Sequence, residues 1–301
     1  MIFLGRGSFA RQLIHAAISI ALRLFFRRIE ASNVEKAPRE GAIIFVLNHP
    51  NGLVDPALVF VSLPRRVSFL AKSTLFKIPV GGWLLRALEA LPVYRRVDAD
   101  GEMAKNLETF RAAQELLARG RCVAIFPEGI SHDDTKLKPI KTGAARIALG
   151  ALGIQDSKFK IQNSPEVEDR KPKIENRFDL KIMAVGLYYT SKTAFRSEVL
   201  IRYGEIFAVE PVELNENGEP PPAAVQALTD RIESALRRVT LNLESAEELD
   251  AALKPEALFS SVYQNLLFRQ TLAQSFQRLQ NLAEKYRLLG ENEPEKMREL
   301  N

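Results

Sequence analysis

The sequence predicts an α/β fold with a largely parallel or mixed central sheet flanked by helices, an N-terminal amphipathic helix and a C-terminal helical extension. Short apolar runs of strand length alternate with longer segments of helical periodicity. The chain has 301 residues, of which 46% are hydrophobic and 26% charged. This length and composition suit one large globular domain with appendages.

The first element is a basic, apolar segment that we predict to be an amphipathic helix over residues 1–30. The chain has five arginines and no acidic residue up to Arg28, around the apolar stretch "LIHAAISIALRLFF". This stretch is shorter than the roughly 20 apolar residues of a spanning helix. The following "RRIE" does not resemble a signal-peptide cleavage site. Two interpretations remain open: a helix at a membrane surface and a helix packed on the domain.

The segment "GRGSFA" at residues 5–10 has the glycine spacing of a dinucleotide-binding loop, and Glu30 follows at a suitable distance. Only four residues, "MIFL", precede this segment. They are too few for the first strand of a buried βαβ unit. We therefore reject the nucleotide-binding interpretation.

Residues 31–243 are expected to form the main domain. Residues 41–48, "GAIIFVLN", are continuously apolar, as in a strand buried on both faces of a parallel sheet. The other expected strands are "RVSFLAK", "LPVYRR", "RCVAIF", "KIMAVGLYY" and "SEVLIRYG". The expected helices are "PALVFVSLP", "IPVGGWLLRALEA", "MAKNLETFRAAQELLARG", "KTGAARIALGALG" and residues 223–243. Residues 155–178 break every periodicity and are expected to form an excursion loop.

Residues 244–301 are predicted to form a C-terminal helical extension. Its apolar residues recur near one face at helical spacing. They are Val262, Leu266, Leu272, Phe276, Leu279, Leu282 and Tyr286. We expect this face to pack against the main domain.

Polar chemistry is concentrated in three loops that follow predicted strands: "NHPNGLVD", "YRRVD" and "PEGISHDD". In α/β folds, ligand sites gather at the carboxyl ends of strands. His49 with Asp55 close behind suits a general base with an orienting carboxylate. The spacing alone also fits an ordinary hydrogen bond within the loop.

No serine or cysteine of this sequence sits in a nucleophile elbow. There is no G-x-S-x-G motif, and the single cysteine, Cys122, lies inside a predicted strand. One cysteine also excludes a disulfide framework and a cysteine metal cluster. We therefore expect the attacking hydroxyl to belong to the substrate, while Lys72 and other basic residues near the strand ends hold an anionic group.

The formal net charge of +5 permits an anionic partner without identifying it. A nucleic-acid binder would carry a recognised motif or a basic cluster with interleaved aromatic residues. Neither occurs in the sequence, so we expect no nucleic-acid partner.

Several blocks occur together in an order and spacing that resemble the glycerophospholipid acyltransferase family. These blocks are "NHPNGLVDP", "LAKSTLFKIPVGGWLL", "LPVYRR", "IFPEGISHDDTKLKPIKTGAA" and "VGLYYTSKTAFRSEV", and they cover about residues 42–204. The family's usual first block has four residues between histidine and aspartate, whereas five lie between His49 and Asp55. This insertion, with "FPEGISHDD" and "FRS", resembles the branch of fungal glycerol 3-phosphate and dihydroxyacetone phosphate acyltransferases.

The resemblance implies roles for individual residues. His49 would deprotonate the acceptor hydroxyl and Asp55 would hold it. Lys72 and Arg95 would contact the acceptor phosphate, while Glu128 and Gly129 would shape the acceptor pocket.

One departure from the family pattern leaves a phosphate contact missing. Most members carry an arginine two positions after the glycine, where this chain has Ser131, followed by His132. By the resemblance Lys138, Lys141 or Arg196 could replace that arginine, and Lys141 and Arg196 are the better candidates because both lie in blocks that match the branch.

The expected function is transfer of a fatty acyl group from acyl-CoA or acyl carrier protein to glycerol 3-phosphate or its 1-acyl derivative. The resemblance implies no metal and no bound cofactor. The expected partners are the thioester donor, the glycerol phosphate acceptor and a membrane surface, with the chain membrane-associated on the cytoplasmic face. Two alternatives stay open: an acyltransferase acting on another lysolipid, and a non-catalytic lipid-binding protein on the same fold.

Overall fold

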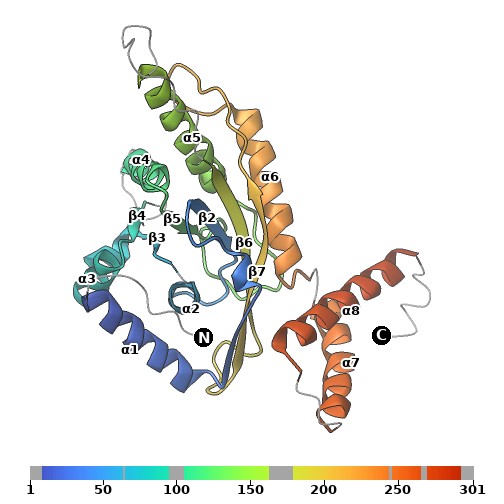
Figure 1. Cartoon of the computed structure of the whole chain (residues 1–301). Helices are drawn as coiled ribbons and strands as arrows, with labels where there is room; N and C mark the ends of the chain where they lie inside the picture. Colours follow the sequence, from blue (N-terminus) through green and yellow to red (C-terminus); the bar gives the residue numbers. More distant parts are fainter. Residues whose placement is uncertain are drawn as a thin grey trace.

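A seven-stranded mixed sheet forms the centre of the molecule, as the sequence predicts (Figure 1). The computed structural model describes residues 9–63, 65–94, 105–162, 179–243, 246–265 and 270–292. The strands are β1 (Arg28–Ser32), β2 (Ala42–Leu47), β3 (Val67–Lys72), β4 (Leu91–Val93), β5 (Cys122–Ile125), β6 (Leu180–Tyr189) and β7 (Glu198–Ala208). Their order across the sheet is β1-β7-β6-β2-β5-β3-β4.

The helices cover both faces of this sheet. They are α1 (Phe9–Phe25), α2 (Val54–Ser62), α3 (Pro79–Ala87), α4 (Lys105–Ala118), α5 (Gly143–Gln162), α6 (Pro222–Val239), α7 (Ala246–Asn265) and α8 (Leu272–Asn292), with 3-10 turns η1 (Val34–Lys36) and η2 (Ser73–Lys77). One buried apolar cluster joins α4, α5 and α6 to the sheet, and another joins α1 and α2 to its other face. Because the central strand β2 is buried on both sides, its six residues are all apolar.

All described strand pairs are parallel except β6 with β7, which is antiparallel. The strands β2, β3, β4, β5 and β6 therefore end at the same edge of the sheet. Loops that follow them, however far apart in the sequence, meet there.

The N-terminal helix is shorter than predicted. It ends at Phe25, and residues 28–32 form strand β1, which pairs with β7. A strand at the edge of a sheet carries little hydrophobic periodicity of its own, so its pairing depends on a partner 170 residues further along the chain, as in Arg28 with Glu198 (198 − 28 = 170).

Helix α1 buries polar side chains against the rest of the protein, which its sequence did not predict. Its buried stripe holds Arg11, His15 and Ser19 before Leu22, whereas Leu13, Ile20 and Leu24 are 55–64% exposed. The Arg11 guanidinium lies 5.2 Å from the centre of the Phe60 ring, and the His15 ring lies 5.4 Å from the same ring. The buried side of the helix therefore mixes polar side chains with apolar ones such as Leu22, while further apolar side chains point to the surroundings.

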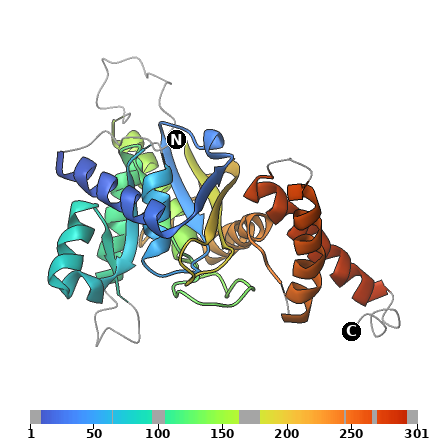
Figure 2. The same cartoon turned by 90° about the horizontal axis from the view of Figure 1, so that it is seen from below.

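The C-terminal extension forms two helices that stand beside the β1 and β7 edge of the sheet (Figure 2). Leu272 and Phe276 of α8 pack on Leu200 and Tyr188, as the predicted apolar face requires. Leu279 is also buried, whereas Val262 and Leu266 belong to the positions whose side chains are not described. Most of the predicted excursion loop, residues 163–178, lies outside the described residues, and α5 continues through Gln162.

Candidate active site

The predicted histidine and aspartate meet at the carboxyl edge of the sheet. His49 follows β2, and Asp55 lies in the first turn of α2. The His49 Nδ1 atom is 2.8 Å from Asp55 Oδ2, and the two side chains are 15% and 0% exposed. Within the described residues, no hydrogen bond engages His49 Nε2. This nitrogen is therefore available to accept a proton from a bound hydroxyl.

Asp55 is buried, but its carboxylate is fully supplied with donors. The backbone N–H of Asn51 donates to Oδ2 at 2.7 Å, and the Tyr189 hydroxyl donates to Oδ1 at 2.5 Å. A buried carboxylate needs such donors to remain ionised. The His49 ring is held from another side by the Phe126 ring, which stacks on it at 4.1 Å between ring centres.

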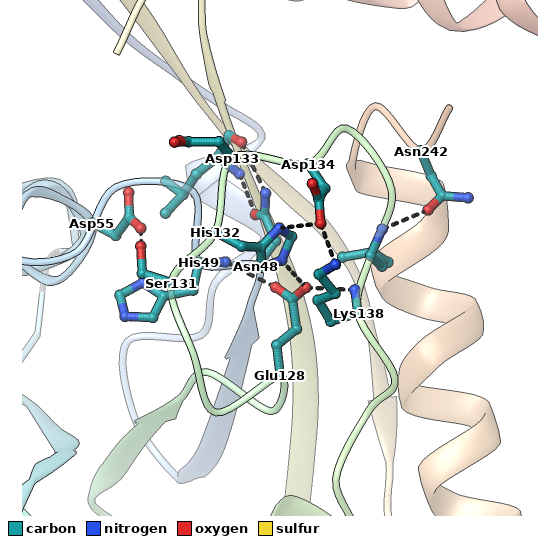
Figure 3. A network of polar contacts seen from close by, with 12 residues as sticks. Asn48, His49, Asp55, Glu128, Ser131, His132, Asp133, Asp134, Lys138 and Asn242 are labelled. Atoms are coloured by element: carbon teal, nitrogen blue, oxygen red, sulfur yellow. Dashed lines mark hydrogen bonds and ion pairs between the residues drawn. The ribbon is translucent and has the colours of Figure 1, made fainter. Parts of the chain in front are cut away.

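Glu128 connects the His49 loop with the loop that follows β5 (Figure 3). Its Oε1 accepts the backbone N–H of His49 at 3.0 Å, and its Oε2 accepts the backbone N–H of Lys138 at 2.8 Å. The His132 Nε2 atom lies 2.5 Å from the same Oε2. The Glu128 side chain is completely buried and contacts three protein nitrogens, so it holds the two loops together. The assignment of Glu128 to the acceptor pocket stays a prediction.

Gly129 and Lys141 lie against each other. Gly129 has a φ of +72°, and a Cβ atom built on it would stand 2.5 Å from the Lys141 Nζ. The Lys141 backbone N–H donates to the Pro127 carbonyl at 2.9 Å. Any larger residue at position 129 would both strain the turn and displace the lysine side chain.

The other predicted phosphate contacts are spread along the edge. Lys72 ends β3 and precedes η2, next to a hollow of about 500 Å³. That hollow is lined by Ser73, Phe76, Lys77, Arg86, Ala90, Pro92 and Tyr94. Arg95 lies outside the described residues. Arg196 is exposed with a φ of +65°, and its backbone N–H donates to the Phe25 carbonyl.

His132 stands beside the position where the family carries an arginine, and it contributes to the loop framework. Its backbone N–H donates to the His49 carbonyl at 3.2 Å, in addition to the contact with Glu128. Ser131 accepts the backbone N–H of Gly52 at 2.9 Å. These two residues therefore join the loops of the site, and the sequence analysis did not foresee that role.

A second hollow, of about 200 Å³, lies on the β6 side of His49. Its lining combines polar groups of the loops with leucines of the C-terminal region. They include His132, Lys192, Leu241, Leu249 and Leu253. No group of three or more histidine, cysteine or acidic side chains suited to a metal ion occurs among the residues with a described placement.

Sequence reasoning missed Asn48, Phe126 and Tyr189. The Asn48 side chain exchanges two hydrogen bonds with the Leu187 backbone, at 3.0 and 2.8 Å, and so extends the β2 and β6 pairing past the end of β2. All three residues stand at the carboxyl ends of predicted strands. Their position was visible in the sequence, but their partners depended on which strands are neighbours.

This fold and site define a class of protein: an α/β domain with a histidine and a buried carboxylate in contact at the carboxyl edge of its sheet. Residues 28–162 of the chain match the model of the Acyltransferase family.

Relatives with assigned names are similar over larger parts of the chain. Glycerol-3-phosphate O-acyltransferase 1 of Saccharomyces cerevisiae is 26% identical over 75% of this chain and 38% of that protein. Glycerol-3-phosphate O-acyltransferase 2 of the same yeast is 30% identical over 54% of this chain and 19% of that protein. The chain thus matches well under half the length of these two relatives.

Two further acyltransferases are similar to parts of this chain. A chloroplastic 1-acyl-sn-glycerol-3-phosphate acyltransferase of Brassica napus is 29% identical over 41% of this chain and 34% of that protein. The crystal structure of the 1-acyl-sn-glycerophosphate acyltransferase PlsC from Thermotoga maritima matches 76% of this chain and 82% of that chain. Its TM-score is 0.46 and its sequence identity is 20%.

Proposed function

We propose that this protein transfers a fatty acyl group from an acyl thioester to a free hydroxyl of glycerol 3-phosphate or 1-acyl-glycerol 3-phosphate. The observation that carries the proposal is the contact of 2.8 Å between His49 Nδ1 and the buried Asp55 carboxylate. This pair can accept a proton at Nε2 and stabilise the resulting imidazolium. The names of the yeast and plant relatives supply the substrate class.

The reaction needs no group beyond the base and the two substrates. His49 Nε2 takes the proton of the acceptor hydroxyl while its oxygen forms a bond to the thioester carbonyl carbon. The carbon–sulfur bond then breaks, and the thiolate leaves with the proton from the imidazolium. The products are an ester and a free thiol, so atoms and charge balance. The thioester is already activated, and positioning with general-base catalysis suffices.

The acceptor phosphate is assigned to the side of His49 that leads to β3 and β4. Lys72 ends β3, and the predicted contact Arg95 follows Tyr94 in the sequence. A hollow of about 500 Å³ lies between these elements and η2. The lining of this hollow includes Lys77 and Arg86, and cations there suit a phosphate monoester, whose oxygens accept charge-assisted hydrogen bonds. The names of the two yeast relatives favour glycerol 3-phosphate over its 1-acyl derivative.

The exposed apolar face of α1 supports a second proposal, that the protein acts at a membrane surface. Leu13, Ile20 and Leu24 lie on this face, while Arg23 is also exposed. An apolar helix face with basic residues suits the boundary of an anionic leaflet. Among the helices of the described ranges, none is sufficiently long and apolar to cross a bilayer. The proposed arrangement is therefore a helix lying at the surface, on the side where the lipid product is released.

The test is thiol release from palmitoyl-CoA by the full chain in mixed micelles, with three acceptors offered separately. These are glycerol 3-phosphate, 1-acyl-glycerol 3-phosphate and a lysolipid without a terminal phosphate. Release with either phosphate acceptor supports the proposal. Release with the third acceptor alone would overturn the phosphate assignment. Lipid binding without release in any arm would identify the non-catalytic alternative.

A further inference from the structure

We infer that Tyr189 is a positioning residue of this site, acting through Asp55 on His49. The inference rests on the proposed function and adds a third side chain to the pair. The contact is a hydrogen bond of 2.5 Å from the Tyr189 hydroxyl to Asp55 Oδ1, the oxygen that does not face His49.

The sheet register brings these residues together. Leu47 pairs with Val185 in the parallel strands β2 and β6. Tyr189 is four residues beyond Val185, so it lies level with position 51, inside the loop between His49 and the start of α2. The side chains of Tyr189 and Asp55 are both buried on the α1 and α2 face of the sheet. The tyrosine therefore reaches the carboxylate oxygen that does not face His49.

Three donors then define the orientation of one carboxylate. Oδ2 receives the His49 and Asn51 nitrogens, and Oδ1 receives the Tyr189 hydroxyl. Without the tyrosine, Oδ1 would be a buried acceptor with no partner, which is costly for a charged group. The carboxylate would then rotate, and this change disturbs its contact with the proton-bearing nitrogen of His49.

Tyr189 remains a donor throughout the working pH range. Burial, reinforced by the negative charge of Asp55, raises the pKa of Tyr189 well above its ordinary value. The hydroxyl therefore keeps its proton and does not compete with His49 as a base.

The test compares Tyr189→Phe with Tyr203→Phe in the full chain. Tyr203 is a matched control because its buried hydroxyl contacts Ser62 at 2.7 Å on the same face of the sheet, away from His49. We expect Tyr189→Phe to lower kcat by about tenfold to a hundredfold, the effect of losing a hydrogen bond to a charged group, with both KM values nearly unchanged. Tyr203→Phe should retain the wild-type kcat.

A double variant separates positioning from general packing. If Tyr189 acts only through the Asp55 charge, Tyr189→Phe combined with Asp55→Asn should be no slower than Asp55→Asn alone. Losses that multiply in the double variant would overturn the inference.

A spectroscopic measurement keeps the inference testable even if no acceptor is acylated. The chain has three histidines, so the downfield proton of the His49 Nδ1–H group can be assigned by NMR with single His→Gln variants. We expect this signal in the wild type and in Tyr203→Phe, and its loss in Tyr189→Phe. Persistence of the signal in Tyr189→Phe would contradict the inference. Absence of acyl transfer by the wild type would contradict only the proposed function.

Discussion

At the scale of single residues, the site is built from groups that hold one another. Asp55 receives three donors, and Glu128 contacts three nitrogens of the neighbouring loops. Both oxygens of each carboxylate therefore accept hydrogen bonds from within the protein. His49 Nε2 has no hydrogen-bond partner in the described part of the site, and the proposed chemistry belongs to this atom.

Replacement of His49 by alanine tests the base directly. We expect His49→Ala to lower kcat by about 10²- to 10⁴-fold, the usual contribution of a general base, while the thermal midpoint stays close to that of the wild type. Thiol release under saturating substrates measures the first quantity, and circular dichroism the second. A variant that keeps more than about a tenth of the wild-type kcat would exclude His49 as the base.

Replacement of Asp55 by asparagine tests the orienting charge. The amide has nearly the same shape but cannot stabilise an imidazolium, so we expect a loss of kcat of about 10²-fold or more without loss of fold. The measurement is kcat across pH 6 to 9. Wild-type turnover in this variant would show that the carboxylate next to His49 has no part in the reaction.

At the scale of elements, α1 buries three polar side chains while it leaves several apolar ones exposed. Arg11, His15 and Ser19 are at most 7% exposed, and each has a buried atom without a hydrogen-bond partner. In water, folding favours the opposite arrangement, with apolar side chains inside. The exposed apolar side chains of α1 are the observation on which the proposed membrane contact rests.

The exposed apolar residues of α1 allow a test of membrane association. We expect the triple substitution of Leu13, Ile20 and Leu24 by serine to reduce cosedimentation with anionic vesicles, since the apolar contact is lost while the buried face of α1 remains. A matched control replaces Leu107, Leu258 and Leu288, which are 44–70% exposed on α4, α7 and α8. Equal sedimentation of the two triple variants would contradict a membrane role for α1.

The buried His15 makes α1 sensitive to acid. Burial, opposed in part by a hydrogen bond with the Val61 backbone, lowers the pKa of His15 below its ordinary value. Between the ordinary histidine pKa of about 6.5 and the lower folded value, the unfolded chain binds more protons. The contribution of neutral His15 to the free energy of unfolding is therefore fully present above about pH 6.5, and it is lost as the pH falls through this window. We expect His15→Leu to flatten the pH dependence of the urea midpoint between pH 7 and 5, and an unchanged dependence would contradict this account.

At the scale of the whole molecule, the C-terminal helices are attached to the edge of the sheet by specific contacts. Both oxygens of Glu30 accept backbone N–H groups at the start of α8, from Leu272 at 2.8 Å and Ala273 at 2.9 Å. Arg202 of β7 donates to Gln277 and Gln280 of the same helix, each at 2.7 Å. The strand β1, which the sequence did not reveal, is thus one of the elements that hold the extension.

Loss of the Glu30 contacts should weaken this attachment. We expect Glu30→Ala to reduce the free energy of unfolding by about 1 kcal/mol, the usual contribution of a residue that caps a helix. Chemical denaturation measures the change in the free energy of unfolding. The control is Glu35→Ala, because Glu35 is exposed. Equal stability of the two variants would show that the cap does not contribute.

The sequence by itself determined the elements whose signals are local. The run at residues 41–48 predicted the central strand because a strand buried on both faces must be apolar throughout. His49 and Asp55 are close enough in the chain that one loop can join them, so their contact was also predictable.

Only the tertiary structure decided the remaining features, because they depend on which segments become neighbours. Tyr189 is 134 residues from Asp55, and β1 obtains its partner from β7. The pattern of α1 revealed two faces, but helical periodicity cannot say which of them the protein covers. Arg11 and His15 pack on Phe60, whereas Leu13, Ile20 and Leu24 remain exposed.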